Sequence, residues 1–240
     1  MGQILDWTRA RSPLEAAALS LLINVAMFAG ALAIGHGLRR LSRGSPVTER
    51  PGPLRRGELL LAATCVAANA LVMIAGWSLY RARWLDVQAD SRPGRVVGDA
   101  LILLVAMDLG MYVTHRIAHL PFVFRHVHGV HHRYDRVRPL TLFVLHPLEV
   151  LGFGALWIAV LSSHAFSLLG MLLYLAMNLL YGVVGHLGVE PLPARWRSSA
   201  LGRGLGTSTF HARHHQEPNA NFGFYTTVWD RLLGTWAGGR

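Results

Sequence analysis

Residues 108–132 read DLGMYVTHRIAHLPFVFRHVHGVHH and contain two closely spaced histidine motifs. The first is an H-x-x-x-H motif formed by His115 and His119, and the second is an H-x-x-H-H motif beginning at His128. Residues three or four apart share a helix face, so each motif is expected to present its rings on one side of a helix. A face of several imidazoles contributes little to packing and would repel itself if protonated. The stretch therefore favours metal binding over a structural role.

The H-x-x-H-H motif returns near the C-terminus as HARHH at residues 211–215. One further histidine, His186, follows a long apolar run and joins these motifs as a candidate ligand. The nine candidate metal ligands, which are also the candidate catalytic residues, are His115, His119, His128, His131, His132, His186, His211, His214 and His215. Nine imidazoles exceed the four or so ligands that one ion usually takes, so the sequence predicts two ions.

Composition points to a membrane protein. The chain has 240 residues, of which 52% are hydrophobic, and its mean hydropathy is +0.34. All 23 basic residues are arginine, and they lie mostly between apolar runs, which favours anchoring beside a membrane over nucleic-acid binding. The single cysteine, Cys65, lies within an apolar run and excludes a disulfide framework or a thiolate metal site.

Four apolar stretches predict the membrane-spanning helices. Runs at 14–35, 59–80 and about 96–114 each approach the roughly 20 residues that a bilayer core requires. The run at 148–185 is too long for one helix and is interrupted at residues 162–164, which predicts a hairpin of two helices. We expect an all-α bundle of about four transmembrane helices with a histidine-rich helical cap, divided into an N-terminal region (1–95) and a His-box domain (96–240).

The arginine distribution predicts the orientation of this bundle. If 148–185 is a hairpin, the segments 36–58, 115–147 and 186–240 face the same side of the membrane. Seventeen arginines lie in these segments, whereas six lie in residues 1–13 and 81–96. The positive-inside rule then places the histidine motifs and the C-terminus in the cytoplasm and the N-terminus outside.

These motifs, in this order, resemble the fatty acid hydroxylase/sterol desaturase superfamily of integral-membrane oxygenases. The resemblance covers roughly 96–236 and includes the His motifs, the HPLE box at 146–149, the NFG segment at 221–223 and the WDRLLGT ending at 229–235. It implies two iron ions, for which zinc can substitute on overexpression, that activate O₂ to attack a lipid C–H bond at the cytoplasmic membrane face. Seven further residues are candidates for orienting the ligands: Asp108, Tyr112, His146, Glu149, Asn178, Asn221 and Asp230.

The resemblance leaves the reaction and the lipid open. Hydroxylation and desaturation, and sterol, fatty acyl, carotenoid or alkylglycerol substrates, all remain compatible with these motifs. The chain has no cytochrome b5-type HPGG segment and no cysteine cluster, which implies a separate electron donor such as a ferredoxin, a flavoprotein reductase or a cytochrome b5-like protein. The arginine-rich face would suit an acidic donor.

Three positions depart from the family pattern. Some members have another histidine where this chain has Gly182, so one ion is expected to have fewer protein ligands. Phe222 stands where tyrosine is more usual, and His126 lies off the face of its neighbours, where a structural or supporting role is expected. His36 and His164 lie outside the motifs and receive no role.

Other kinds of protein were weighed against this interpretation. A membrane b-type cytochrome would hold haem with histidines in the middle of opposing spans, whereas these motifs lie beyond the ends of spans. A metal transporter would need polar residues along several spans, and the first two predicted spans contain no ionisable residue in their middle. A purely structural zinc site needs only four ligands. A metal-binding or metal-transport protein without catalysis remains the main alternative.

Overall fold

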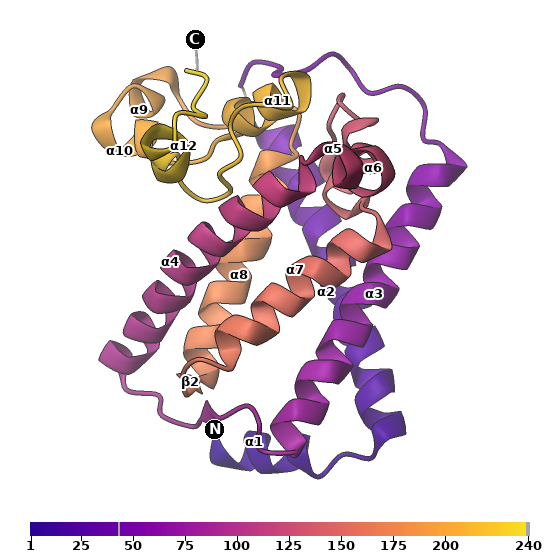
Figure 1. Cartoon of the computed structure of the whole chain (residues 1–240), viewed down its shortest axis with the longest axis vertical. Coiled ribbons are helices and arrows are strands. Elements are labelled where there is room, and N and C mark those ends of the chain that lie inside the picture. Colours follow the sequence, from indigo (N-terminus) through magenta and orange to yellow (C-terminus); the bar gives the residue numbers. More distant parts are fainter. Residues whose placement is uncertain (43, 239–240) are drawn as a thin grey trace.

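Five apolar helices alternate in direction through the molecule, a computed structural model that describes residues 1–42 and 44–238 (Figure 1). They are α2 (Pro13–Leu41), α3 (Arg56–Arg81), α4 (Pro93–Ala118), α7 (Pro147–Leu161) and α8 (Leu168–Gly185). The hairpin expected at 148–185 is confirmed as α7 and α8, which are separated where residues 162–164 interrupt the apolar run. Arg43 of the arginine count and the last two residues of the tail lie outside the described residues.

Four of these helices, α2, α3, α4 and α8, are long and apolar enough to cross a membrane. The fifth, α7, is equally apolar but has 15 residues. At 1.5 Å per residue it is about 22 Å long, which is shorter than the ~30 Å hydrocarbon core of a bilayer. The expected all-α membrane bundle of about four spans is therefore confirmed.

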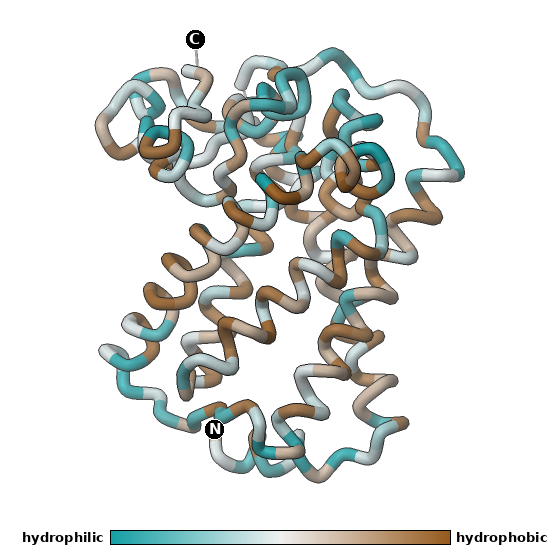
Figure 2. The backbone as a smooth tube through the Cα atoms, in the orientation of Figure 1, coloured by the Kyte–Doolittle hydropathy of each residue, from teal (hydrophilic) through white to brown (hydrophobic). Residues whose placement is uncertain are grey.

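The remaining elements are short. At the lower end in Figure 1 lie α1 (Gly2–Arg9) and a two-stranded parallel sheet in which β1 (Val87–Gln88) pairs with β2 (Phe166–Ser167). At the upper end lie α5 (Pro121–Val123), the π-helical turn η1 (Phe124–His128), α6 (Gly129–His132), the 3-10 turn η2 (Pro139–Phe143), α9 (Ala194–Arg197), α10 (Ala200–Gly204), α11 (Ser208–Gln216) and α12 (Val228–Leu232). Figure 2 shows that this upper end is mostly hydrophilic, whereas the helices below it are mostly hydrophobic. All three histidine motifs therefore lie at one end of the bundle, as expected from their spacing along the chain.

Local sequence signals explain where the helices begin. Ser12 accepts a hydrogen bond from the backbone N–H of Glu15, and the Glu15 side chain accepts one from Ser12, so this capping box starts α2 at Pro13. Ser167 caps α8 in the same way through Gly170. Thr207 caps α11, the helix that carries the last histidine motif, through Phe210.

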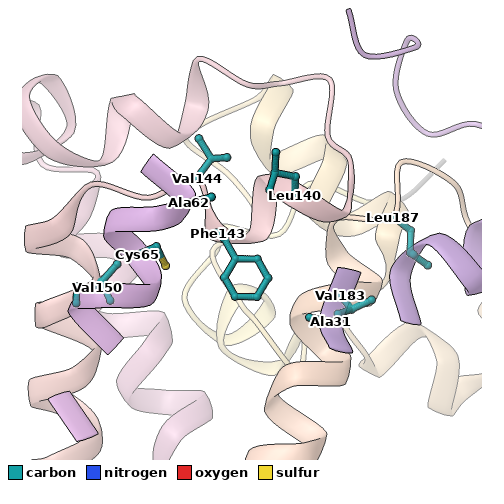
Figure 3. Packing of buried hydrophobic residues seen from close by; sticks show 10 residues of the cluster. Ala31, Ala62, Cys65, Leu140, Phe143, Val144, Val150, Val183 and Leu187 are labelled. Carbon is teal, nitrogen blue, oxygen red and sulfur yellow. The ribbon is translucent and has the colours of Figure 1, made fainter. Parts of the chain in front are cut away.

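A hydrophobic cluster packs directly beneath the histidines. Side chains from α2, α3, η2, α7 and α8 meet around Phe143 and Val144, and Figure 3 shows Val144 next to Ala62 and the ring of Phe143 below them. Glu58, which is 2% exposed, forms an ion pair with Arg138 and ties α3 to the beginning of η2. Val144 is fully buried in this cluster. The carbonyl of Val144 accepts a hydrogen bond from one of the candidate ligands, as described below.

Candidate metal centre

The structure brings all nine candidate ligands together in two adjacent groups. The larger group contains His115, His119, His128, His132 and His214, and the smaller contains His131, His186, His211 and His215. Within each group, the ligand nitrogens all lie within 4.8 Å of one another. The rings of His132 and His215, one from each group, have centroids 4.8 Å apart, so the two groups share a border.

Neighbouring residues in one motif serve different groups. His128 and His132, four residues apart, belong to the five-histidine group, whereas His131 belongs to the four-histidine group. The trio at 128–132 is thus divided between the two groups, although its three ring centroids lie within 6.0 Å of one another, as expected for rings on one side of a helix. The C-terminal motif divides similarly, since His211 and His215 share one group and His214 joins the other.

The π-helical turn η1 sets the position of His128. It ends at His128 and is followed by Gly129, where an added Cβ would lie 2.6 Å from the carbonyl oxygen of Phe124. Only glycine tolerates so close an approach of the backbone. The wide turn and Gly129 thus position His128 against the end of α4, where its Nε2 lies 3.1 Å from the Nε2 of His115.

Backbone carbonyls orient four of the imidazoles. The Nδ1 atom of each donates to one carbonyl oxygen: His115 to Phe222 at 2.8 Å, His131 to Val144 at 3.0 Å, His186 to Gly182 at 2.9 Å and His214 to Ala220 at 2.7 Å. A carbonyl oxygen can only accept, so Nδ1 carries the proton and Nε2 presents a lone pair to the centre of its group.

The inward nitrogens fit a cation. His131 and His186 both donate through Nδ1, yet their Nε2 atoms face each other at 3.4 Å. Two lone pairs without a proton between them repel, and a metal ion between them removes the repulsion. Two nitrogens bound to one ion at about 2.1 Å lie roughly 3.0–3.4 Å apart, which matches the separations in both groups. The buried Nε2 of His119 also has no hydrogen-bond partner among the described residues, as expected of a metal ligand.

Burial keeps these rings in the form that binds metal. It lowers the pKa of His131 and of His186 to about 4 and that of His132 to about 2. The pKa values of His211, His214 and His215 also lie well below the usual range, because desolvation and the neighbouring imidazoles disfavour a positive charge. The rings outside the spans are therefore neutral at neutral pH, and neutral imidazole is the form that binds a transition metal.

Of the seven residues expected to orient the ligands, Glu149 makes a direct contact. Its carboxylate accepts from Nδ1 of His128 at 2.7 Å, with both side chains almost fully buried. A carboxylate behind an imidazole fixes its tautomer and raises its basicity toward a metal.

Two other acids act on the segment that supplies a carbonyl. Asp230 accepts from the backbone N–H groups of Phe222 and Gly223 at 2.8 and 2.7 Å, and so holds the peptide whose carbonyl orients His115. Asp108 accepts from Tyr225, Thr226 and Trp229 and fastens the same segment to α4.

The other four candidates hold the surroundings. Tyr112 bonds to Thr235, Asn178 accepts from Tyr225, and His146 caps the start of α7 at Leu148. Asn221 adopts a left-handed conformation with φ of +60° and bonds to Phe210 and Ala237. Among the described residues none of these four side chains has a hydrogen bond to a histidine of either group, so their action on the ligands is indirect.

Sequence reasoning missed the four carbonyl acceptors and Glu190. The side chain of Glu190, which is 4% exposed, accepts from the backbone and hydroxyl of Thr209 and fixes the first turn of α11. A carbonyl acceptor has no side-chain signature, so no motif could have identified it. Glu190 is isolated in a proline-rich loop, and nothing in its spacing connects it with the histidines.

The departures from the family pattern have structural counterparts. Gly182 lies under the four-histidine group, and its carbonyl accepts from His186. Phe222 packs edge-on against His115 and His119 and lies under the guanidinium of Arg116. His126 is exposed, and among the described residues its ring hydrogen-bonds to the carbonyl of Phe122 and lies outside both groups.

A small cavity adjoins the four-histidine group alone. It has a volume of about 10 Å³, room for about one water molecule, and His186 and His211 form part of its wall. Aromatic side chains complete the lining, among them Tyr181, Phe210 and Phe224. A small ligand at this group therefore has a place beside the metal-facing nitrogens.

The fold and the site together define a class: helical membrane proteins that gather histidines into metal-binding groups at one end of the bundle. The sequence model of the family described as fatty acid hydroxylase matches residues 100–235, more than half of the chain. The chain belongs to the fatty acid hydroxylase family. The matched residues include every histidine of both groups and all seven residues proposed to orient them.

Curated relatives have several different activities in their names. The chain is 30% identical to a cholesterol 25-hydroxylase-like protein of Danio rerio, with 70% of this chain and 68% of the relative covered. It is 32% identical to a very-long-chain aldehyde decarbonylase of Oryza sativa subsp. indica (58% and 53% covered) and 28% identical to a Delta(7)-sterol 5(6)-desaturase of Eremothecium gossypii (69% and 44% covered). The chain thus spans about half the length of several of the relatives it matches. No solved structure matches it.

Proposed function

We propose that the protein is a membrane-bound di-iron oxygenase that hydroxylates or desaturates a C–H bond of a lipid, sterol-like or fatty acyl. The observation that carries this proposal is the pair of adjacent groups in which nine imidazole nitrogens converge, five in one group and four in the other. Two iron ions held there would supply the activation of O₂. The names of the relatives from Danio rerio and Eremothecium gossypii support both a hydroxylase and a desaturase.

The position of the histidines supports a substrate that comes from the bilayer. His115 lies in the last turn of α4, and His186 directly follows α8, so both groups lie at the ends of apolar spans. A lipid lying among the spans would bring its carbon chain to this layer while its remaining atoms stay in an apolar environment. The histidines would bind the metal ions, and the hydrogen-bond partners of their Nδ1 atoms orient the rings. Burial of these side chains excludes water.

The proposed reaction is balanced by an external reductant. Hydroxylation transfers one oxygen atom of O₂ to the carbon and releases the other as water, with two electrons and two protons from a donor. Desaturation removes two hydrogens from the lipid and, with the same two electrons and two protons, reduces O₂ to two waters. A separate ferredoxin or cytochrome b5-like protein with its reductase would supply the electrons, and exposed arginines at the metal end, such as Arg125 and Arg133, would attract an acidic donor.

Lipid analysis of cells that express the protein tests the activity. We expect a lipid that gains one oxygen atom or loses two hydrogens, and the change should disappear without air. It should also disappear in His128→Ala and His211→Ala, which each remove one ligand from a different group. His126→Ala, an exposed residue outside both groups, should retain the product and serves as the matched control.

Isotopes and reductant distinguish the remaining outcomes. Labelled O₂, and not labelled water, should supply the oxygen of a hydroxylated product. If wild type and both ligand variants show identical sterol, fatty acyl and carotenoid profiles with reductase supplied, the oxygenase proposal is wrong and a metal-binding or metal-transport role replaces it.

We further propose that the metal end faces the cytoplasm, which the bias of 17 arginines against six supports. A reporter enzyme that works only in the cytoplasm should then be active when it is fused to the C-terminus. Activity of a reporter that requires the opposite compartment would overturn this orientation and separate the metal centre from cytoplasmic electron donors.

A further inference from the structure

The C-terminal segment 222–236 is attached to α4 well before that helix ends. Asp108 accepts from the backbone N–H groups of Tyr225 and Thr226, both at 3.2 Å, and from the indole of Trp229 at 3.0 Å. Tyr112 bonds to Thr235 at 2.9 Å. Asp108 lies ten residues before the end of α4 at Ala118, which corresponds to about 15 Å along the helix.

The surface of α4 beneath this attachment is exposed and apolar. Leu101 and Val105 lie seven residues before Asp108 and Tyr112 respectively, and residues seven apart share a helix face. Leu101 and Val105 are 53% and 63% exposed, whereas Asp108 and Tyr112 are 5% and 2% exposed. One face of a membrane-spanning helix thus passes from open apolar surface to buried surface within about two turns. If α4 spans a bilayer, the acyl chains that cover Leu101 and Val105 would lie close to the edge of this segment.

Most backbone N–H groups of the irregular part of the segment are paired within the protein. It is irregular around residues 222–227, yet Asp230 accepts from two of its N–H groups and Asp108 from two more. The N–H of Thr227 donates to the carbonyl of Gly204, and the carbonyl of Tyr225 accepts from Gly206. Irregular backbone near the hydrocarbon is tolerated only when its polar groups are paired within the protein.

The outer side of the segment is apolar and bordered by arginine. Leu232 and Leu233 are 70% and 60% exposed, and Trp236 is 40% exposed. The guanidinium of Arg231 lies 3.8 Å from the Trp236 ring centroid and bonds to the carbonyl of Arg203. Figure 1 shows α12 on the outer flank of the upper end, and Figure 2 shows hydrophobic residues there within a mostly hydrophilic cap. Leucine and tryptophan beside arginine are typical of helices that lie in the membrane interface.

We propose that α12 and the residues around it are set into the membrane interface at the metal end. Leu232 and Leu233 lie among the first carbons of the acyl chains, and Arg203 and Arg231 lie at the level of the lipid phosphates. Because the same segment supplies the Phe222 carbonyl that orients His115, the lipid surface and the five-histidine group are joined through one short piece of chain. Although the sequence after residue 186 is mostly polar, this part of the tail then belongs to the membrane region. The proposal depends on the membrane spans and not on catalysis.

Depth-resolved fluorescence quenching tests the proposal on the full-length protein. Single cysteines replace Leu232, Leu101 or Gln216 in a Cys65→Ala background and carry an environment-sensitive dye, with the protein in vesicles of phosphatidylcholine and phosphatidylglycerol. Leu101 represents the lipid-facing part of α4, and Gln216 is an exposed polar position at the end of α11 in the same cap. All three positions are exposed, so the substitutions leave the packing unchanged.

Each outcome decides the proposal. We expect the dye at Leu232→Cys to be quenched more by nitroxides near the headgroup than by nitroxides deep in the acyl chain. Its quenching by iodide should be at least about fivefold weaker than at Gln216→Cys, because an ion does not enter hydrocarbon. Iodide quenching equal to that at Gln216→Cys would overturn the proposal. A deep pattern like that at Leu101→Cys would overturn the interfacial depth. Neither readout requires metal or activity, so the result is independent of the proposed function.

Discussion

At the scale of single residues, the hydrogen-bond acceptor at Nδ1 determines how each imidazole is oriented and how strongly it can bind a metal ion. Carbonyl oxygens fix the proton on Nδ1 in four rings, whereas His128 faces the carboxylate of Glu149. A neutral acceptor only orients a ring, but a negatively charged one also strengthens its bond to a cation. The two groups therefore differ in electrostatics as well as in ligand number.

Replacement of Glu149 by glutamine should weaken one metal site selectively. Glu149→Gln keeps an acceptor near His128 but removes the charge, so affinity at the five-histidine group should fall about 10–100-fold while the other group is unchanged. Metal content measured after equilibration with graded chelator should show one of the two ions leaving earlier than in wild type. Glu49→Gln, at an exposed carboxylate that pairs with Arg136, is the control. Equal weakening of both ions would contradict the assignment.

The adjacent residues His131 and His132 should behave as ligands of different ions. We expect each single alanine variant to lose one ion and to retain the other, because the two rings belong to different groups. His131→Ala combined with His186→Ala should resemble either single variant, since both remove ligands from one site, whereas His131→Ala with His132→Ala should lose both ions. Elemental analysis of folded protein, with cobalt as a spectroscopic substitute, measures this. Identical cobalt spectra for the two single variants would show that the residues share one ion.

At the scale of elements, the closeness of neighbouring helices depends on residues without side chains. α7 packs against α3 and α4, and Gly154 of α7 lies directly against Val72 of α3. Gly152, two residues earlier in α7, has no atom within 4 Å of where a Cβ would lie. This pair offers a matched test of helix packing beneath the metal centre.

Gly154→Ala should destabilise the bundle, and Gly152→Ala should not. A methyl group at residue 154 collides with a branched side chain that has little freedom to move, and such overpacking typically costs about 1–3 kcal/mol. At residue 152 the methyl group meets open space and improves helix propensity by up to about 1 kcal/mol. Thermal unfolding in one detergent, compared between the two variants, measures the difference. Equal unfolding midpoints for the two variants would show that α3 and α7 can move apart without loss of stability.

At the scale of the whole molecule, folding places many ionisable rings in a nearly dry layer. Burial lowers the pKa of His131 and of His186 to about 4, whereas the same rings in the unfolded chain titrate near 6.5. Between these pH values the unfolded state binds more protons than the folded state. Stability therefore rises with pH in this window and is lost as pH falls.

The metal-free protein should accordingly become less stable as pH drops from 6.5 toward 4. Each buried ring contributes up to about 1.4 kcal/mol per pH unit in this range. Unfolding midpoints of chelator-treated protein between pH 8 and 5 should be level above about 6.5 and decline below it. The double variant His131→Ala/His186→Ala should show a shallower decline. A midpoint independent of pH would mean that these rings titrate at the same pH in the folded and unfolded states, which would contradict the lowered pKa values.

The sequence by itself determined the features that depend on local patterns. The apolar runs located the ends of the helices to within about six residues, and the interruption at 162–164 located the turn between α7 and α8. The histidine spacings pointed to eight residues of the two groups, because each motif carries its rings at helical intervals, and the end of an apolar run pointed to the ninth, His186.

Only the tertiary structure decided how these residues are shared and supported. The division into five and four follows from which helix faces meet, so His131 and His132 belong to different groups although they are adjacent in the sequence. His115 finds its acceptor at Phe222, 107 residues away, and Asp108 holds a segment more than 115 residues away. Such contacts leave no spacing to recognise, because a backbone carbonyl is the same in every residue and long-range distances depend on how the whole chain folds.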